Sequence, residues 1–301
     1  MGSASLRQLI CALPALRVDV GGVAVVGPVT IDRIVQDGEE AHKRGGVITF
    51  AGLTFAEMGV ETRVVTKLAA ADGAVLEPLH QRGIEVCAAT SRATTRFVNY
   101  VDGDARRQEM SAWAGAIGAE QLESALIGIE LVHLGPLHPD DIGPDALAAI
   151  PGACRVGLDV QGYVRQIAGE RVDRGVSPHL CAALRRAEFV KTSIDELDLV
   201  LDHCGRPLQD LVEDCAIAEW VVTAGSRGGW VLDRMGARTE FASPQVAEVV
   251  DPTGAGDVFF AAYMAFRHHR GQTVVDSLQR AAAQAARQVS GGFITPTILR
   301  L

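Results

Sequence analysis

The chain lacks the features of several large classes of protein. Its six cysteines form no C-x-x-C pair, so the sequence offers no zinc-site or disulfide spacing. Its eight histidines form no i, i+4 metal-binding pair. No run of Lys and Arg exceeds two residues and the formal net charge is −9, which argues against a nucleic-acid partner. We therefore expect reduced thiols in a cytoplasmic protein.

Long apolar segments are also missing, and none approaches the roughly 20 residues of a membrane span. The apolar run Leu9 to Leu16 is short and contains Pro14; a signal peptide is the alternative interpretation there. No repeat and no low-complexity linker divides the 301 residues. We expect one domain over residues 1–301 that does not bind a membrane.

Short apolar runs of strand length alternate with helical patterns. Because these runs are continuously apolar, they predict strands buried on both faces, hence an α/β fold: a three-layer α/β/α sandwich with a mostly parallel sheet. The clearest strands lie at residues 23–26, 63–66, 130–134, 155–159 and 220–223. Helices are predicted near 47–59, 73–82, 118–126, 139–149, 178–186, 194–202 and 206–214.

Two segments, about 28–46 and 93–112, do not fit this sandwich. They mix polar and apolar residues with turn signals, and Tyr100 to Asp104 is a hairpin candidate. They are predicted to pair into a small β lid, or else to be two unrelated surface hairpins.

The most informative motif is the stretch from Val249 to Phe260, where an apolar strand gives way to an apolar helix. Its residues Gly254, Ala255 and Gly256 would let an anion approach backbone N–H groups at a helix start, with Asp257 beside it. An ordinary Gly-rich turn with an N-terminal Asp is the alternative. Dinucleotide and P-loop motifs are excluded because their further Gly and Gly-Lys-Ser/Thr residues are absent.

Residues 251–257, Asp-Pro-Thr-Gly-Ala-Gly-Asp, resemble the C-terminal signature of the ribokinase-like (PfkB) carbohydrate and nucleoside kinases. Further landmarks follow the family's order from about residue 22 to 296. The resemblance implies that Asp257 is the catalytic base, that Gly254, Ala255 and Gly256 stabilise the transferring group, and that ATP and Mg²⁺ are used. It also implies a K⁺ near Asp251 and Thr253.

Substrate contacts are predicted in the N-terminal part of the chain. Asp32 follows the first strand, where α/β folds open their ligand crevice, although a solvated loop Asp is the alternative. The family's double-glycine motif lies at Gly45 and Gly46. Phe50 lies at a position where ribokinase-like enzymes carry an amide. Gly135-Pro136 lies at a position where they tend to carry a carboxylate. Both departures favour an inositol-like ring or a nucleoside over ribose.

Three later landmarks complete the expected site. The resemblance makes Arg165 a phosphate or substrate contact similar to that of the myo-inositol-kinase-like branch; a surface Arg paired with a carboxylate is the alternative. Glu196 would hold Mg²⁺ through water, with Ser193 in place of the family's Asn. Ser193 and Glu196 also form a capping-box pattern.

The third of these landmarks, Thr223, Gly225 and Gly228, resembles the family's ATP loop. Taken alone, this segment is typical of an ordinary hairpin turn.

We therefore expect an ATP-dependent phosphotransferase acting on a hydroxyl of a small sugar or polyol. Two alternatives remain: a nucleoside kinase of the same family, and a non-catalytic sugar- or nucleotide-sensing relative. The exposed edge of the lid sheet also predicts a homodimer formed through the lid.

Overall fold

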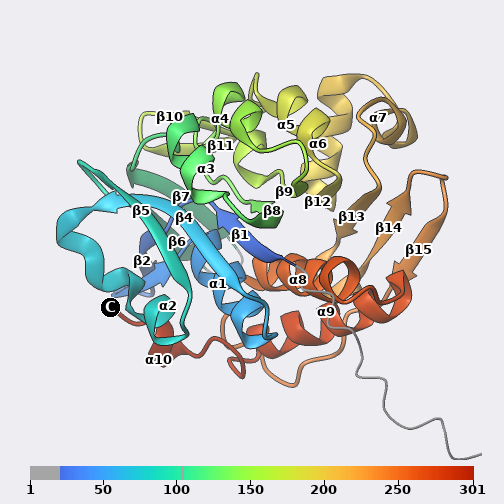
Figure 1. Ribbon diagram of the computed structural model, residues 1–301. Coiled ribbons are helices and arrows are strands. Elements are labelled where there is room, and N and C mark those ends of the chain that lie inside the picture. The colour runs from blue at the N-terminus through green and yellow to red at the C-terminus, as the bar shows by residue number, and fades with distance from the viewer. Residues whose placement is uncertain (1–20, 103–104) are drawn as a thin grey trace, which may run out of the picture.

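A nine-stranded sheet forms the centre of the molecule. The computed structural model describes residues 21–102 and 105–301, so the run Leu9 to Leu16 and the turn residues Gly103 and Asp104 of the predicted hairpin lie outside the described residues. The strand order is β15-β14-β13-β12-β9-β8-β1-β4-β5, and only β13–β14 and β14–β15 pair antiparallel (Figure 1). The strands are β1 Gly22–Val26, β4 Thr62–Ala69, β5 Glu85–Ser91, β8 Ile129–Leu134, β9 Arg155–Asp159, β12 Phe189–Ser193, β13 Glu219–Thr223, β14 Gly229–Asp233 and β15 Arg238–Phe241.

Helices cover both faces of this sheet, which explains the continuously apolar strands. In β1, Val23 and Val25 join one core cluster and Ala24 and Val26 the other, because successive side chains point to opposite faces. One face carries α1 Val47–Glu57, α2 Glu77–Gln81, α8 Ala255–Met264, α9 Val274–Val289 and α10 Pro296–Leu299. The other carries α3 Ala119–Ala125, α4 Pro144–Ala149, α5 Leu180–Arg186, α6 Ile194–Cys204 and α7 Leu208–Asp214. The predicted three-layer sandwich is confirmed.

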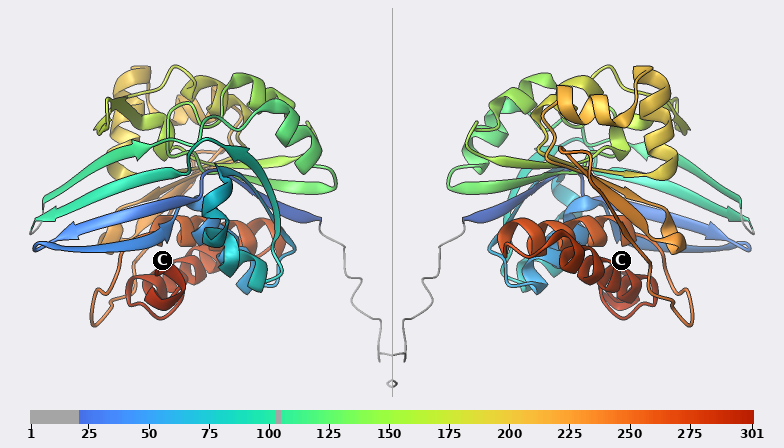
Figure 2. Two further views of the ribbon diagram at one scale, coloured as in Figure 1. Left: turned by 90° about the vertical axis from the view of Figure 1, so that its left-hand side faces the viewer. Right: turned by 90° about the vertical axis from the view of Figure 1, so that its right-hand side faces the viewer.

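A second, six-stranded sheet projects from the side of the sandwich (Figure 2). Its order is β10-β11-β7-β6-β2-β3, and β2 pairs in parallel with β6, so the two predicted lid segments do join. The strands are β2 Thr30–Gln36, β3 Glu39–Gly45, β6 Thr95–Asp102, β7 Ala105–Ala112, β10 Arg165–Ala168 and β11 Arg171–Arg174. The hairpin β10–β11 was not expected from the sequence.

Several elements differ in extent from the predicted ranges. The helix expected over 73–82 is a 3-10 helix, Ala70–Leu76, followed by the short α2. The helix expected over 139–149 begins only at Pro144, because residues 137–141 form a turn around the Asp141 carboxylate. Strand β12 was not among the clearest predictions, since its apolar run is interrupted by Lys191.

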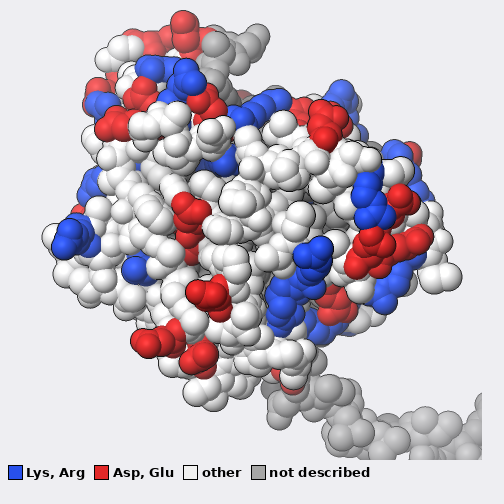
Figure 3. Space-filling view, turned by 90° about the horizontal axis from the view of Figure 1, so that it is seen from above, with Lys and Arg blue, Asp and Glu red and all other residues white. Residues whose placement is uncertain are grey.

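Within residues 21–102 and 105–301, no helix is long and apolar enough to cross a membrane. On the face seen in Figure 3, basic and acidic side chains are interspersed and neither sign forms a continuous patch.

Candidate active site

The motif with which α8 begins forms a tight turn that only glycine can make. Gly254 is the N-cap of α8 with φ 74°, and a Cβ there would lie 2.2 Å from Cδ1 of Phe50. The Ala255 N–H donates to the Pro252 carbonyl oxygen at 3.2 Å. An anion bound at this helix start would therefore be met mainly by the N–H groups of Gly254 and Gly256.

Asp257 lies in the first turn of α8, half-buried and close to several charges. Burial and, second, the nearby Asp159 raise its pKa, Lys191 and Arg165 lower it, and the net pKa is about 7. A carboxyl group with such a pKa can exchange a proton near neutral pH, as a general base must. This placement is compatible with the predicted role of Asp257.

A buried ion pair that the sequence reading missed stands next to this helix start. The Lys191 Nζ atom lies 2.8 Å from Asp159 Oδ2, and the two side chains are only 7% and 4% exposed. A Cβ on Gly256 would lie 3.2 Å from the Lys191 Nζ atom. Burial alone would lower the pKa of Lys191, but Asp159 and Glu196 outweigh it and the net pKa is raised.

Strand register brings this ion pair together. Lys191 on β12 and Asp159 on β9 are register partners in adjacent parallel strands. Asp159 is the last residue of β9, at the strand end where open α/β sheets bind ligands, and Lys191 is the central residue of β12. The one signal in the sequence was a lysine that directly follows two apolar residues, Phe189 and Val190.

Arg165, the first residue of β10, is close enough to Asp257 for their charges to affect each other. Its Nη1 donates to the Leu137 carbonyl oxygen at 3.1 Å, and its guanidinium lies 5.5 Å from the centre of the Phe97 ring. Burial lowers the pKa of Arg165, while Glu196, Asp159, Asp141 and Asp257 raise it. Arginine remains charged under such conditions, so a fixed cation lies within the field of Asp257.

Asp32 lies on β2, and its carboxylate is buried to 9% exposure. Its Oδ1 atom has no hydrogen-bond partner among the described residues. Burial raises the pKa of Asp32 to about 6, with Thr30 and Arg165 opposing that change. A buried acceptor without a partner is destabilising unless a ligand completes it, which is compatible with a contact to substrate hydroxyls.

The double glycine permits this arrangement. A Cβ on Gly45 would lie 2.5 Å from Asp32 Oδ2, and one on Gly46, whose φ is 86°, would lie 2.2 Å from the Pro28 carbonyl oxygen. Any larger residue would therefore displace the Asp32 carboxylate or the chain beside it.

Phe50 occupies a different environment from the one expected. Its side chain is 1% exposed and belongs to the core cluster on the α1–α8 face, with its ring directly under Gly254. The ring supports the turn at the start of α8. A substrate contact at Phe50 stays a prediction that this burial does not favour.

Ser193 and Glu196 form the capping box at the start of α6. The Ser193 N–H donates to Glu196 Oε2 at 2.6 Å, and the Glu196 N–H donates to Ser193 Oγ at 3.3 Å. The capping box leaves Glu196 Oε1 unused, and this carboxylate affects the pKa of Lys191, Arg165 and Asp257. Glu196 thus fits a metal held through water. The described residues contain no cluster of three or more His, Cys, Asp or Glu able to hold an ion.

The predicted donor loop follows β13. Thr223 Oγ1 donates to the Thr192 carbonyl oxygen at 3.4 Å, and Gly225 and Gly228 both have positive φ. A Cβ on Gly228 would lie 2.1 Å from the Phe241 carbonyl oxygen, so this glycine is required by the close approach of the segment after β15.

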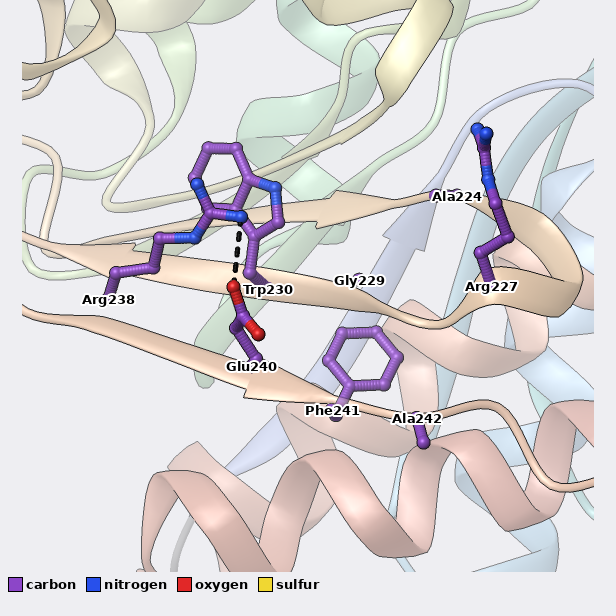
Figure 4. A pocket seen from close by; sticks show the side chains of 8 residues that line it. All are labelled: Ala224, Arg227, Gly229, Trp230, Arg238, Glu240, Phe241 and Ala242. Carbon is purple, nitrogen blue, oxygen red and sulfur yellow. Dashed lines mark ion pairs between the residues drawn. The ribbon is translucent and has the colours of Figure 1, made fainter.

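A pocket of about 430 Å³ adjoins this loop (Figure 4). In it, the Arg238 guanidinium lies over the Trp230 ring at 4.4 Å and pairs with Glu240 at 3.2 Å. Arg227 projects from the turn of the loop, away from that pair. The pocket is lined by Ala224, Arg227, Gly229, Trp230, Arg238, Glu240, Phe241 and Ala242. Ala224, Arg227 and Gly229 belong to the predicted loop, but none of the eight was among its predicted contacts, Thr223, Gly225 and Gly228.

Asp251 and Thr253 already have protein partners. Lys43 Nζ lies 2.8 Å from Asp251 Oδ2, and the Thr253 N–H donates to Asp251 Oδ1 at 2.9 Å. Gln288 Nε2 donates to the Thr253 carbonyl oxygen at 3.3 Å. The oxygens expected to hold K⁺ are therefore engaged, and the residues present do not fit that ion.

Solved structures share this fold over most of their length. A pyrophosphate-dependent kinase in the ribokinase family has a TM-score of 0.77 at 23% identity, with 89% of this chain and 95% of that chain covered. The nucleoside kinase of Methanocaldococcus jannaschii gives 0.75 at 17% identity, covering 89% and 91%. The ribokinase of Arabidopsis thaliana gives 0.70 at 22% identity, covering 90% and 93%. At these identities the likeness shows the fold alone.

Sequence comparison assigns the family. A search of curated proteins finds no match to the chain. Residues 23–296, which include every predicted site residue, match the description "pfkB family carbohydrate kinase". The chain belongs to the pfkB family of carbohydrate kinases.

Proposed function

We propose that the chain transfers the γ-phosphoryl group of ATP to a hydroxyl of a small sugar or polyol, with an inositol-like ring favoured over ribose. The observation that carries this proposal is the position of Asp257. It follows the glycine turn of Gly254 and Gly256 and lies in the field of two cations, Lys191 and Arg165. A base, backbone donors and fixed positive charge are what phosphoryl transfer to an alcohol requires.

The proposed reaction follows from these positions. The acceptor hydroxyl loses its proton to Asp257 while its oxygen bonds to phosphorus, and the bond from phosphorus to the leaving phosphate oxygen breaks. The N–H groups of Gly254 and Gly256 and the Lys191 ammonium would stabilise the negative charge on the transferring group. Glu196 would hold Mg²⁺ through water, and the ion supplies further charge neutralisation. The lid sheet would exclude water during transfer.

The donor is the first point to be tested, since three similar structures are of pyrophosphate-dependent kinases. We favour ATP because apolar surface lies next to the anion turn. Val249 and Val250 are 61% and 49% exposed, and Val250 lies against Gly291, where a Cβ would be 3.1 Å from it. A flat purine can cover such surface, whereas pyrophosphate makes no use of it.

The acceptor is inferred from the other side of the site. Asp32 offers a buried oxygen that no described residue pairs with, and one carboxylate can accept hydrogen bonds from two neighbouring hydroxyls. One of the similar structures is of a kinase in complex with myo-inositol. We propose a polyol ring as the acceptor of this chain because of Asp32 and that structural similarity together.

A donor-by-acceptor screen tests the proposal. The purified protein is incubated with ATP or pyrophosphate and one acceptor each time: myo-inositol, ribose, fructose, adenosine or cytidine, and ³¹P NMR detects the phosphomonoester. We expect product from ATP and a polyol or sugar, and none from the Asp257→Asn variant. Product from pyrophosphate alone would overturn the donor assignment.

Two other results would replace the proposal rather than refine it. Product with nucleosides and not with polyols would identify a nucleoside kinase, a fold neighbour of this chain. Thermal stabilisation by several ligands without product from any pair would identify a sensing protein that kept the fold.

A further inference from the structure

The loop that leads into α8 is held by a charged side chain from the lid sheet. Asp251 is 8% exposed, and its Oδ2 atom lies 2.8 Å from the Nζ atom of Lys43 on β3. Its other oxygen accepts the Thr253 N–H. Burial alone would raise the pKa of Asp251, but Lys43 and Thr253 outweigh it and the net pKa is lowered. The carboxylate is ionised, and its charge is already balanced.

A backbone oxygen in the same loop is engaged as well. The Thr253 carbonyl oxygen accepts a hydrogen bond from Gln288 Nε2 at 3.3 Å. Gln288 is 1% exposed, and its Oε1 accepts the Ile294 N–H at 3.1 Å. The Gln288 amide therefore bridges the loop and the C-terminal segment, because its nitrogen donates one hydrogen bond and its oxygen accepts another.

These contacts supply what a bound monovalent cation would supply. The Lys43 ammonium carries one positive charge and lies at hydrogen-bond distance from the carboxylate, while the Gln288 amide donates to the carbonyl. A second cation at this place would meet the ammonium at close range and be repelled. The chain has only three lysines, Lys43, Lys67 and Lys191, and two of them stand beside the Asp251–Asp257 motif.

We propose that the Lys43 ammonium, with the Gln288 amide, takes the place of a monovalent cation beside Asp251, so that this protein needs no K⁺. The effect on turnover rests on the proposed function, but the effect on the loop does not. Lys43 also lies opposite Asp32 in the β2–β3 register, so the substituted cation would tie the loop before the catalytic base to the strand that carries the acceptor contact.

The test compares thermal unfolding in potassium chloride and in tetramethylammonium chloride at equal ionic strength. For the wild type we expect the same melting temperature in both salts. For Lys43→Met, which leaves the Asp251 carboxylate without its partner, we expect a loss of roughly 3–8 °C in tetramethylammonium. Potassium should restore most of that loss because the carboxylate can then bind the ion.

A matched control is Lys67→Met, since Lys67 Nζ donates to the Ala116 carbonyl oxygen at 3.0 Å and pairs with no carboxylate within residues 21–102 and 105–301. Its melting temperature should not depend on which cation is present. Potassium-specific stabilisation of the wild type would overturn the proposal. This measurement uses only the wild-type protein, so it does not depend on whether a variant folds. A Lys43→Met variant that potassium fails to restore would overturn the proposal too, because Lys43 would then be an ordinary ion pair.

Turnover is measured separately, with and without potassium. Wild-type activity that potassium leaves unchanged supports the inference, and activation by potassium overturns it. If no donor and acceptor pair gives product, the proposed function fails while the unfolding experiment still decides the role of Lys43.

Discussion

Replacing Asp257 with Asn should abolish most turnover and at the same time stabilise the fold. The change keeps the shape of the side chain but removes the carboxylate that we propose accepts the proton. A general base contributes about 10²–10⁴-fold to a rate, and we expect kcat to fall by that factor. The stabilisation arises because the wild-type carboxylate is held where its charged form is disfavoured, by burial first and by Asp159 second.

The magnitude follows from the pKa of Asp257, which is raised from 3.8 to about 7. Each pKa unit corresponds to about 1.4 kcal/mol, so the shift sets an upper limit of about 4 kcal/mol at alkaline pH. The carboxylate is half-buried and partly screened by water, so we expect about 2 kcal/mol. For a chain of this size that corresponds to a rise in melting temperature of roughly 4 °C.

The stability difference between the wild type and Asp257→Asn should depend on pH. Because the folded-state pKa of Asp257 lies above its unfolded value, the folded protein holds the proton more tightly. Its contribution to stability is complete below about pH 4 and is lost as the pH rises towards 7. Asn does not titrate, so the variant should exceed the wild type clearly at pH 8 and by much less at pH 5.

The assay is thermal unfolding of both proteins at pH 5 and pH 8, with turnover measured on the same samples. Asp145→Asn is the control, because Asp145 is an exposed Asp in the first turn of α4. That change should destabilise slightly, by about 0.5 kcal/mol, through the helix dipole. An Asp257→Asn variant less stable than the wild type at pH 8, or a difference independent of pH, would refute the reasoning.

Three further predictions concern the surroundings of Asp257. Asp32→Asn should raise KM for the acceptor more than it lowers kcat. In the wild type, KM should fall as the pH rises through about 6, because the carboxylate then ionises. Steady-state kinetics in which KM does not change with pH would count against a contact between Asp32 and the acceptor. Gly254→Ala should destabilise by roughly 2 kcal/mol or more in urea unfolding, since φ is 74° and an aromatic ring lies under the new Cβ. Gly59→Ala is its control: φ is 70° with nothing within 4 Å, and a loss of about 1 kcal/mol is expected. Lys191→Met should cost about 3–5 kcal/mol in the same assay by leaving Asp159 buried without a counter-charge, and a near-neutral result would show that water reaches the pair.

The local sequence specified the elements and the chemistry of one loop. Continuously apolar runs predicted a sheet covered on both faces, and the glycines at 254 and 256 predicted a helix start that admits an anion. Both predictions depend on short-range rules, because strand burial, positive φ and helix-end donors are properties of a few consecutive residues.

Tertiary structure alone decided which charged groups meet. Lys191 and Asp159 are 32 residues apart, and Lys43 and Asp251 are 208 apart; each pair exists because strand order and the position of the lid sheet bring the two side chains together. It also placed Phe50 under Gly254 instead of in an open site. The sequence by itself determined that this protein carries a carboxylate at a glycine-rich helix start. Only the packing of distant strands determined the charges that set the pKa of that carboxylate, because these electrostatic interactions depend on distances that no local pattern encodes.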